Sequence, residues 1–98
     1  EVTDEDFENA VEDEFGVKYS KDWKRLLEAP RSLSGKYSIS KGVKVIGNMA
    51  FAFCNSLTII NIPNSVTTIG DWAFDGCDSL TSITIPSSVV TIIANPFL

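Results

Sequence analysis

Residues 57–69, LTIINIPNSVTTI, and residues 80–92, LTSITIPSSVVTI, repeat one another at a spacing of 23. The coinciding apolar positions and prolines are Leu57 with Leu80, Ile60 with Ile83, Ile62 with Ile85, Pro63 with Pro86, Val66 with Val89, and Ile69 with Ile92. The same spacing extends backwards, where the residues that precede an identical one by 23 positions are Ile39, Val43, Ile46, Gly47, Ala50, Phe51 and Cys54. Two repeats and most of a third therefore occupy residues 36–98.

A period of this length with a Leu-x-x-Ile-x-Ile core is typical of leucine-rich repeats. Leu57, Ile60 and Ile62 are predicted to lie on one short strand, and Pro63 then turns the chain because proline cannot donate to a continuing ladder. Gly70 permits a tight bend into an outer turn. One unit buries too little apolar surface to fold alone, so stacking is required. The predicted fold is an α+β repeat, a short leucine-rich-repeat solenoid with parallel strands on its concave face and irregular or helical outer turns.

Residues 1–35 precede the repeats and are predicted to cap them. Thr3 to Asp6 resembles a capping box, and an acidic first turn suits a helix N-terminus. The spacing of Phe7, Ala10, Val11 and Phe15 predicts an amphipathic helix over about residues 3–15, ending at Gly16. Residues 17–30 fit two alternatives, a hairpin that turns at Lys21 and Asp22 or a helical turn that carries Trp23, Leu26 and Leu27.

The repeats resemble the bacterial leucine-rich repeats of the BspA type, whose pattern is close to L-x-x-I-x-I-P-x-S-V-x-x-I-G-x-x-A-F-x-x-C. Residues 56–77, SLTIINIPNSVTTIGDWAFDGC, follow it almost position for position. Residues 19–30, YSKDWKRLLEAP, resemble the family's entry hairpin, with Trp23 in place of the usual glycine, and this favours the hairpin. The resemblance implies a non-catalytic binding or adhesion module of a bacterial surface or secreted protein, with a protein or glycan partner.

Charge argues against two classes of partner. The net charge is −5, eight of the first 14 residues are acidic, and no Lys or Arg follows Lys44. A nucleic-acid binder needs a basic stripe, and this chain has none. No apolar run approaches the ~18 residues that cross a bilayer, and the acidic start is unlike a secretory signal. We therefore expect a soluble chain without membrane insertion, whose signal peptide has been removed if the protein is exported.

Residue types also argue against catalysis. The chain has no histidine, which removes the usual nucleophile and general-base pairings. No phosphate-binding loop, cofactor site or metal site is predicted. Cys54 and Cys77 occupy the same repeat position, where parallel side chains suit buried free thiols better than a disulfide. Asp71, Asp75 and Asp78 crowd one outer turn, but calcium needs about six or more oxygens, so a solvated surface is the preferred interpretation.

Candidate binding residues come from the columns that point outward on the predicted strands. One column is Lys36, Ile59 and Ser82, and the other is Ser38, Asn61 and Thr84. Trp72 is added from the outer turn, because an exposed tryptophan could anchor a sugar or a protein. The predicted partner-binding residues are Ile59, Asn61, Ser82, Thr84 and Trp72. The alternatives are plain solvent exposure for the columns, and packing on a neighbouring outer turn for Trp72.

The third repeat departs from the pattern. Ile93 stands where Gly47 and Gly70 stand, and Pro96 stands where the other repeats have alanine. Its incompletely covered edge is expected to invite self-association, giving a homo-oligomer through the open C-terminal repeat. This supports a second functional hypothesis, a structural terminal cap or spacer.

Overall fold

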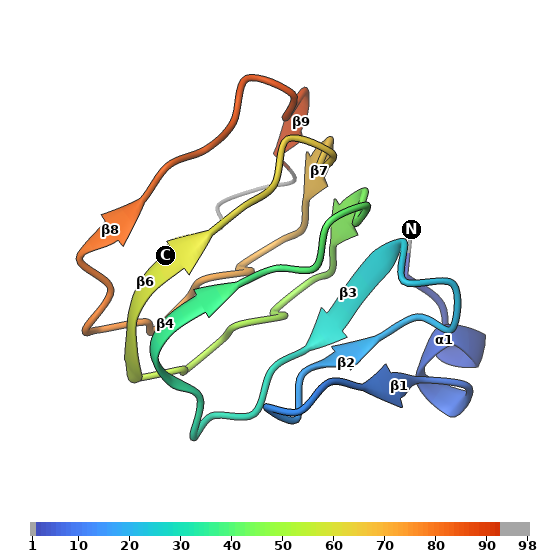
Figure 1. Ribbon diagram of the computed structural model, residues 1–98, viewed down its shortest axis with the longest axis horizontal. Coiled ribbons are helices and arrows are strands. Elements are labelled where there is room, and N and C mark those ends of the chain that lie inside the picture. Colours follow the sequence, from blue (N-terminus) through green and yellow to red (C-terminus); the bar gives the residue numbers. More distant parts are fainter. Residues whose placement is uncertain (1, 93–98) are drawn as a thin grey trace.

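The computed structural model describes residues 2–92, which form one short helix and nine strands. The elements are α1 Asp4–Glu8, β1 Val11–Glu12, β2 Lys18–Tyr19, β3 Arg25–Glu28, β4 Ser34–Ser38, β5 Val45–Ile46, β6 Ser56–Asn61, β7 Thr68–Ile69, β8 Ser82–Ile83 and β9 Thr91–Ile92. They make two sheets, β1-β2-β3-β5-β7-β9 and β4-β6-β8, which lie side by side along the molecule (Figure 1). No helix within residues 2–92 has the length and hydropathy to cross a membrane.

The register of the parallel strands reproduces the sequence repeat. In one sheet Tyr37 pairs with Ile60 and Ile60 with Ile83. In the other sheet Val45 pairs with Thr68 and Thr68 with Thr91. Each step is 23 residues, so every repeat supplies one strand to each sheet and lies directly beside its neighbour. The leucine-rich-repeat arrangement of parallel strands is therefore confirmed.

The core lies between the two sheets and consists of stacked repeat positions. Leu57, Val66 and Ile69 are fully buried. Phe51 and Phe74, one repeat apart, stack with ring centroids 5.4 Å apart and planes 7° from parallel. Equivalent residues of successive repeats thus contact one another, as the spacing of the apolar positions predicts.

The outer turns are held by their own ladder of backbone hydrogen bonds. The amides of Met49, Phe51 and Phe53 donate to the carbonyls of Asp71, Ala73 and Asp75, at 2.9, 2.7 and 2.7 Å. Residues 48–53 and 71–76 are turns rather than helices. The second turn thus lies on the first as a neighbouring strand would, and these three amides and three carbonyls are paired across the two turns.

The N-terminal helix is shorter than predicted, and the expectation of a helix over residues 3–15 is wrong in extent. The capping box of Thr3 and Asp6 is present, but α1 ends at Glu8 and β1 pairs antiparallel with β2. The Asp13 carboxylate accepts the amides of Phe15 and Val17 at 2.8 and 3.0 Å, which bends the chain and competes with helix. Strand pairing with β2 therefore overrides the helical spacing, and Phe15 is exposed.

The ambiguous segment after Gly16 takes the hairpin form. Strands β2 and β3 are antiparallel, with Tyr19 opposite Leu26, and β3 then pairs in parallel with β5. Trp23 adopts the left-handed conformation, with φ 61°, and its ring lies on Tyr19 with centroids 4.5 Å apart. Trp23 thus adopts a backbone conformation that glycine reaches more easily, with its ring packed on Tyr19. The predicted departures at Ile93 and Pro96 lie outside the described residues.

Candidate functional site

The sheet β4-β6-β8 presents the predicted columns in register on its outward side. Lys36 pairs with Ile59 and Ile59 with Ser82, while Ser38 pairs with Asn61. We call this surface the strand face, and its residues are Lys36, Ser38, Ile59, Asn61, Ser82 and Thr84. Thr84 follows the end of β8 and is exposed, as are all the others except the half-buried Ile59. Four of the five predicted binding residues therefore belong to one surface.

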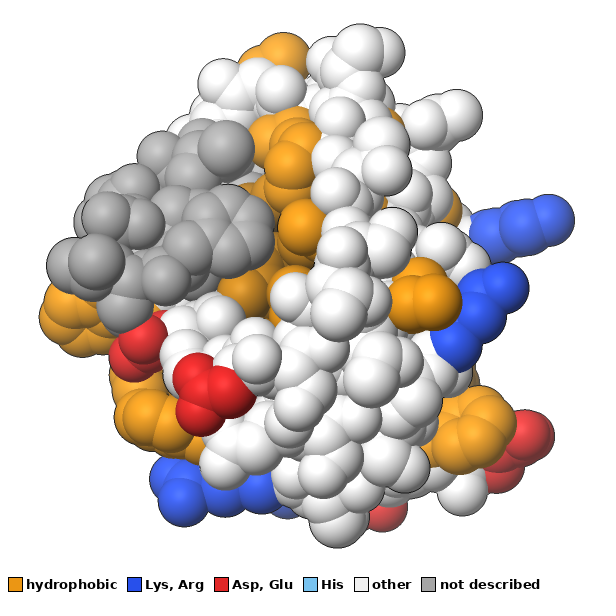
Figure 2. All heavy atoms as spheres, turned by 90° about the vertical axis from the view of Figure 1, so that its left-hand side faces the viewer, with side chains coloured by type: hydrophobic (Ala, Val, Ile, Leu, Met, Phe, Trp, Pro, Cys, Tyr) orange, Lys and Arg blue, Asp and Glu red, His pale blue; other side chains and the backbone are white. Residues whose placement is uncertain are grey.

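The strand face is polar but carries little charge. The Asn61 side-chain amide donates to the Ser38 hydroxyl at 3.0 Å, one repeat away, which orients both groups. Lys36 is the one charged residue among the six. Figure 2 looks onto this side of the molecule and shows mostly small polar side chains and backbone, with some hydrophobic side chains and few charges. Such a surface can offer hydrogen bonds and a small apolar area to a partner.

Trp72 lies apart from the strand face, in the outer turn between β7 and β8. Its side chain is 43% exposed and its backbone is left-handed, with φ 54°. Met49, at the same position of the preceding repeat, is 46% exposed with φ 57°. The structure therefore does not place Trp72 with the other four predicted residues.

A hollow of mixed polar and apolar lining on the outer turns was not predicted from the sequence. Apolar and polar side chains together line a hollow of about 290 Å³, among them Phe7, Met49, Phe53, Glu28 and Asn48. The Arg31 guanidinium lies 5.1 Å from the centre of the Phe53 ring. The sequence does hold one indication of this turn geometry, because Gly76 stands at the repeat position of Phe53. Both residues have positive φ, which glycine adopts most easily. Positive φ also accompanies an exposed large side chain at Trp23, Met49 and Trp72.

The acidic outer turn forms no metal cluster among residues 2–92. The amide of Asp71 donates to the Asn48 side-chain oxygen at 2.8 Å, which links equivalent positions of adjacent repeats. Asp71 Oδ1 is buried and has no hydrogen-bond partner in the described part of the chain. Asp78 is exposed. Within the described residues, these carboxylates do not converge on a shared ligand position.

Cys54 and Cys77 are free thiols. Cys54 donates to the Pro30 carbonyl at 3.5 Å and Cys77 to the Phe51 carbonyl at 3.1 Å. Burial raises the pKa of Cys54 to about 11 and also raises the pKa of Cys77. Because the thiolate is the reactive form, this environment disfavours nucleophilic chemistry at neutral pH.

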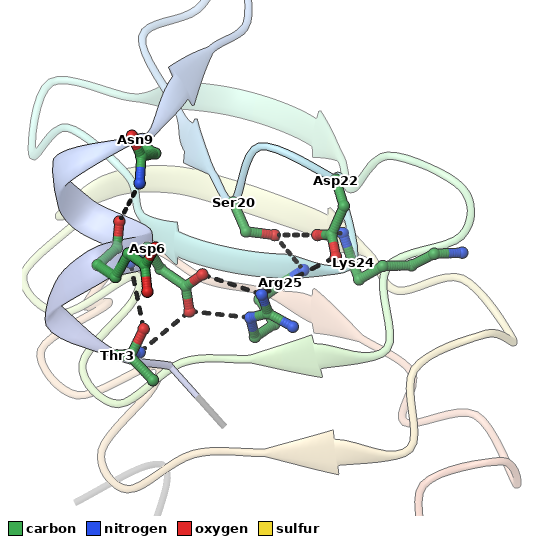
Figure 3. A network of polar contacts seen from close by, with 8 residues as sticks. Thr3, Asp6, Asn9, Ser20, Asp22, Lys24 and Arg25 are labelled. Carbon is green, nitrogen blue, oxygen red and sulfur yellow. Dashed lines mark hydrogen bonds and ion pairs between the residues drawn. The ribbon is translucent and has the colours of Figure 1, made fainter.

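A polar network joins α1 to the hairpin (Figure 3). Arg25 donates from Nε and Nη2 to the two carboxylate oxygens of Asp6, both at 2.9 Å. Asp6 also accepts the amide of Thr3. The hydrogen bonds from Arg25 are the largest cause of a pKa for Asp6 lowered to about 2. Both charged groups are engaged with each other, so the network fixes α1 in place rather than offering a reactive carboxylate.

Comparison with known proteins places these features in a family. The model of the BspA-type leucine-rich repeat region, with six copies, matches residues 32–98. A leucine-rich repeat protein from Eubacterium ventriosum is 34% identical, with a TM-score of 0.82 over 87% of this chain and 23% of its own. One from Bacteroides capillosus is 34% identical, with a TM-score of 0.63 over 86% of this chain and 61% of its own. The chain thus spans less than two thirds of either structure, and a comparison with curated proteins gave no match.

Proposed function

Because the chain belongs to the BspA-type leucine-rich repeat family, we propose that it is a non-catalytic binding module that holds a protein or glycan partner on its strand face. Repeats of this family are typically protein-binding modules, and the proteins that carry them are usually at the cell surface or secreted. The proposed setting is accordingly a bacterial adhesion protein at the surface or outside the cell.

The observation that carries the proposal is the alignment of outward side chains across β4, β6 and β8. Three strands in parallel register hold Asn61 and Ser82 at the rim of the half-buried Ile59. Partner-binding surfaces commonly have an apolar centre inside a polar rim. Small side chains also allow a partner to approach the strands closely, and the sheet keeps their spacing rigid.

The N-terminal segment supports the binding role indirectly. In the proposed solenoid, α1 and the hairpin cap the first repeat, because β3 pairs with β5 and Arg25 ties α1 to β3. Tyr37 on β4 donates to Asp13 at 2.6 Å, and Tyr19 hydrogen-bonds to the Tyr37 hydroxyl. The first strand of the binding sheet is thereby anchored to the cap.

The test is saturable binding of the immobilised chain to a panel of extracellular matrix proteins and glycans. We expect Asn61→Lys and Thr84→Lys each to weaken a positive interaction at least about tenfold, which is about 1.4 kcal/mol. Asn64→Lys is the matched control, because it makes the same change at an exposed turn residue after β6 and should leave the affinity unchanged. Trp72→Ala tests the outer turn.

Three outcomes decide whether the strand face is the binding site. Loss of binding with the strand-face variants and not with Asn64→Lys supports the proposal. Loss with Trp72→Ala alone would move the site to the outer turns. Binding that survives every variant, or a silent panel, would count against the strand face and favour the alternative function, a structural cap or spacer that self-associates.

A further inference from the structure

We propose that two adjacent hollows beside α1 bind a neutral oligosaccharide, at a site separate from the strand face. The turn hollow holds about 290 Å³, and its lining includes Phe7, Glu28, Arg31, Asn48, Met49 and Phe53. The sheet hollow holds about 510 Å³, and its lining includes Phe7, Leu27, Val45, Asn48 and Thr68. Phe7 of α1 lines both, and α1 lies on the opposite side of the molecule from β4, β6 and β8 (Figure 1).

The two hollows share part of their lining. Phe7, Leu27 and Asn48 contribute to both, so the hollows adjoin at these residues. The turn hollow alone is slightly smaller than the ~300–1,000 Å³ of typical small-molecule sites. One compact ring therefore fits the turn hollow, and a unit linked to it can continue into the sheet hollow. This arrangement suits a ligand built of short linked units.

The charged groups of the site favour an uncharged ligand. Among the described residues, the lining of the two hollows holds one carboxylate, Glu28, and one guanidinium, Arg31. Neither side chain makes an ion pair or a hydrogen bond within residues 2–92. An anionic ligand would meet the carboxylate of Glu28, and a cationic ligand would meet the guanidinium of Arg31. The two together match a ligand without net charge that both donates and accepts hydrogen bonds.

Asn48 adds a third planar polar group, and its orientation is fixed. Its side-chain oxygen accepts the amide of Asp71 at 2.8 Å. Its side-chain NH₂ group has no partner in the described part of the chain and is free to donate. Carboxylate, guanidinium and amide groups each present two polar atoms side by side. Because each hydroxyl of a sugar ring both donates and accepts, neighbouring hydroxyls can bond to all three kinds of group.

Apolar side chains form the other part of the turn hollow. Phe7, Met49 and Phe53 are 45, 46 and 40% exposed. The Arg31 guanidinium lies over the Phe53 ring, which places a cation and an apolar surface side by side. A sugar ring has C–H groups on its faces and hydroxyls around its edge. It can therefore bury apolar area against these side chains while its hydroxyls stay hydrogen-bonded.

A peptide fits the two hollows less well. Leu27 belongs to β3 and Val45 to β5, and both strands lie inside their sheet, with a neighbour on each side. Their backbone groups are already paired, so a peptide cannot join the sheet here as a further strand. It would bind through side chains alone. An apolar side chain in the turn hollow would then leave Glu28 and Arg31 desolvated without a partner.

The test is calorimetric titration of the chain with three neutral probes, cellotetraose, chitotetraose and maltotetraose. At least one should bind with a Kd on the order of 0.1–1 mM, as expected for a small and open site. Two charged probes test the charge argument, namely tetragalacturonate and the fully deacetylated, cationic form of chitotetraose. Each should bind at least about fivefold more weakly than the best neutral probe, because one of the two charged side chains opposes it.

Charge-removing variants locate the site. Arg31→Ala and Glu28→Ala should each weaken oligosaccharide binding at least about fivefold. Lys41→Ala and Glu12→Ala are the matched controls, because they remove the same kinds of charge at exposed positions elsewhere. Both controls should leave the affinity unchanged.

A third variant tests the apolar part of the site. Phe53→Gly removes the ring and should also weaken binding at least about fivefold. The next repeat has Gly76 at the same position with positive φ, so the variant should keep the fold, as checked by circular dichroism. Asn61→Lys, on the strand face, should leave oligosaccharide binding unchanged.

Four results would overturn the proposal. The first is that no neutral probe binds up to about 10 mM. The second is tighter binding of a charged probe, or of an acetylated and amidated tetrapeptide, than of every neutral oligosaccharide. The third is binding that is insensitive to Arg31→Ala and Glu28→Ala, and the fourth is binding that Asn61→Lys abolishes. Because Asn61→Lys tests the strand face and Arg31→Ala the hollows, failure of one proposal is distinguishable from failure of the other.

Discussion

Gly47 and Gly70 occupy the same repeat position, but the space around them excludes a larger side chain to different degrees. A Cβ on Gly70 would lie 2.6 Å from both the amide nitrogen and the side-chain oxygen of Asn48. A Cβ on Gly47 would meet the Val2 side chain at 3.0 Å and the Leu26 carbonyl at 3.1 Å. The first contact is with the fixed backbone of the adjacent repeat, while the closest neighbour of Gly47 is a side chain that can move.

We therefore predict that Gly70→Ala lowers the free energy of unfolding by about 1–3 kcal/mol, the usual cost of overpacking. Gly47→Ala, the matched control, should cost clearly less, because Val2 can adjust. Urea-induced unfolding of both variants measures the difference. Equal losses would mean that Asn48 and its outer turn yield as readily as Val2 does.

Among the elements, α1 illustrates a helix whose place depends on one tertiary contact. Five residues are too few for a stable isolated helix. The Asp6 side chain is 11% exposed and that of Arg25 28%, and their two hydrogen bonds attach α1 to β3. The helix is therefore held by the hairpin, and its stability should follow the ionisation of Asp6.

Acid titration tests this dependence. The pKa of Asp6 is lowered from 3.8 to about 2, so its contribution to stability is present above about pH 4 and is lost as the pH falls through about 2. Asp6→Asn should lower the free energy of unfolding at neutral pH by at most about 2 kcal/mol and flatten its pH dependence between about pH 4 and 2.

The control for Asp6→Asn is Glu8→Gln, which removes an exposed carboxylate from the same helix. Glu8→Gln should leave both the stability and its acid profile nearly unchanged. If the two variants had the same profile, the contact between Asp6 and Arg25 would contribute nothing specific, as is common for exposed ion pairs.

At the scale of the whole molecule, stability is expected to decrease along the stack. Each repeat gains most of its burial from the repeats on either side of it. The second repeat has a neighbour on both sides, whereas the third has one within the described residues, and its core positions are half-buried. The third repeat should therefore open before the second.

Paired truncations measure this gradient. Leu57→Ala should lower the free energy of unfolding by about 2–5 kcal/mol, as for a fully buried leucine. Leu80→Ala makes the same change at the same repeat position and should cost about half as much or less, because Leu80 is only half-buried. Similar costs at the two positions would contradict a stability gradient.

The repeat spacing by itself determined the strand register, the buried columns and the family. This is possible because a period of 23 specifies which residues of adjacent repeats meet, so the spacing alone assigns Leu57, Ile60 and Ile69 to the core. The same spacing placed Ile59 beside Ser82 on the strand face. The role of the strand face in binding stays a prediction.

Only the tertiary structure decided what happens outside the strict period. The spacing of Phe7, Val11 and Phe15 predicts a helix, but Val11 pairs with β2 and forms a strand instead. A pattern within residues 3–15 cannot reveal a strand partner that lies outside them. Trp72 was separated from the strand face because the outer turn places it between β7 and β8. The repeat spacing specifies the contacts between repeated units. The conformation of the non-repeated segments depends instead on the surfaces and strand edges that the packed repeats offer them.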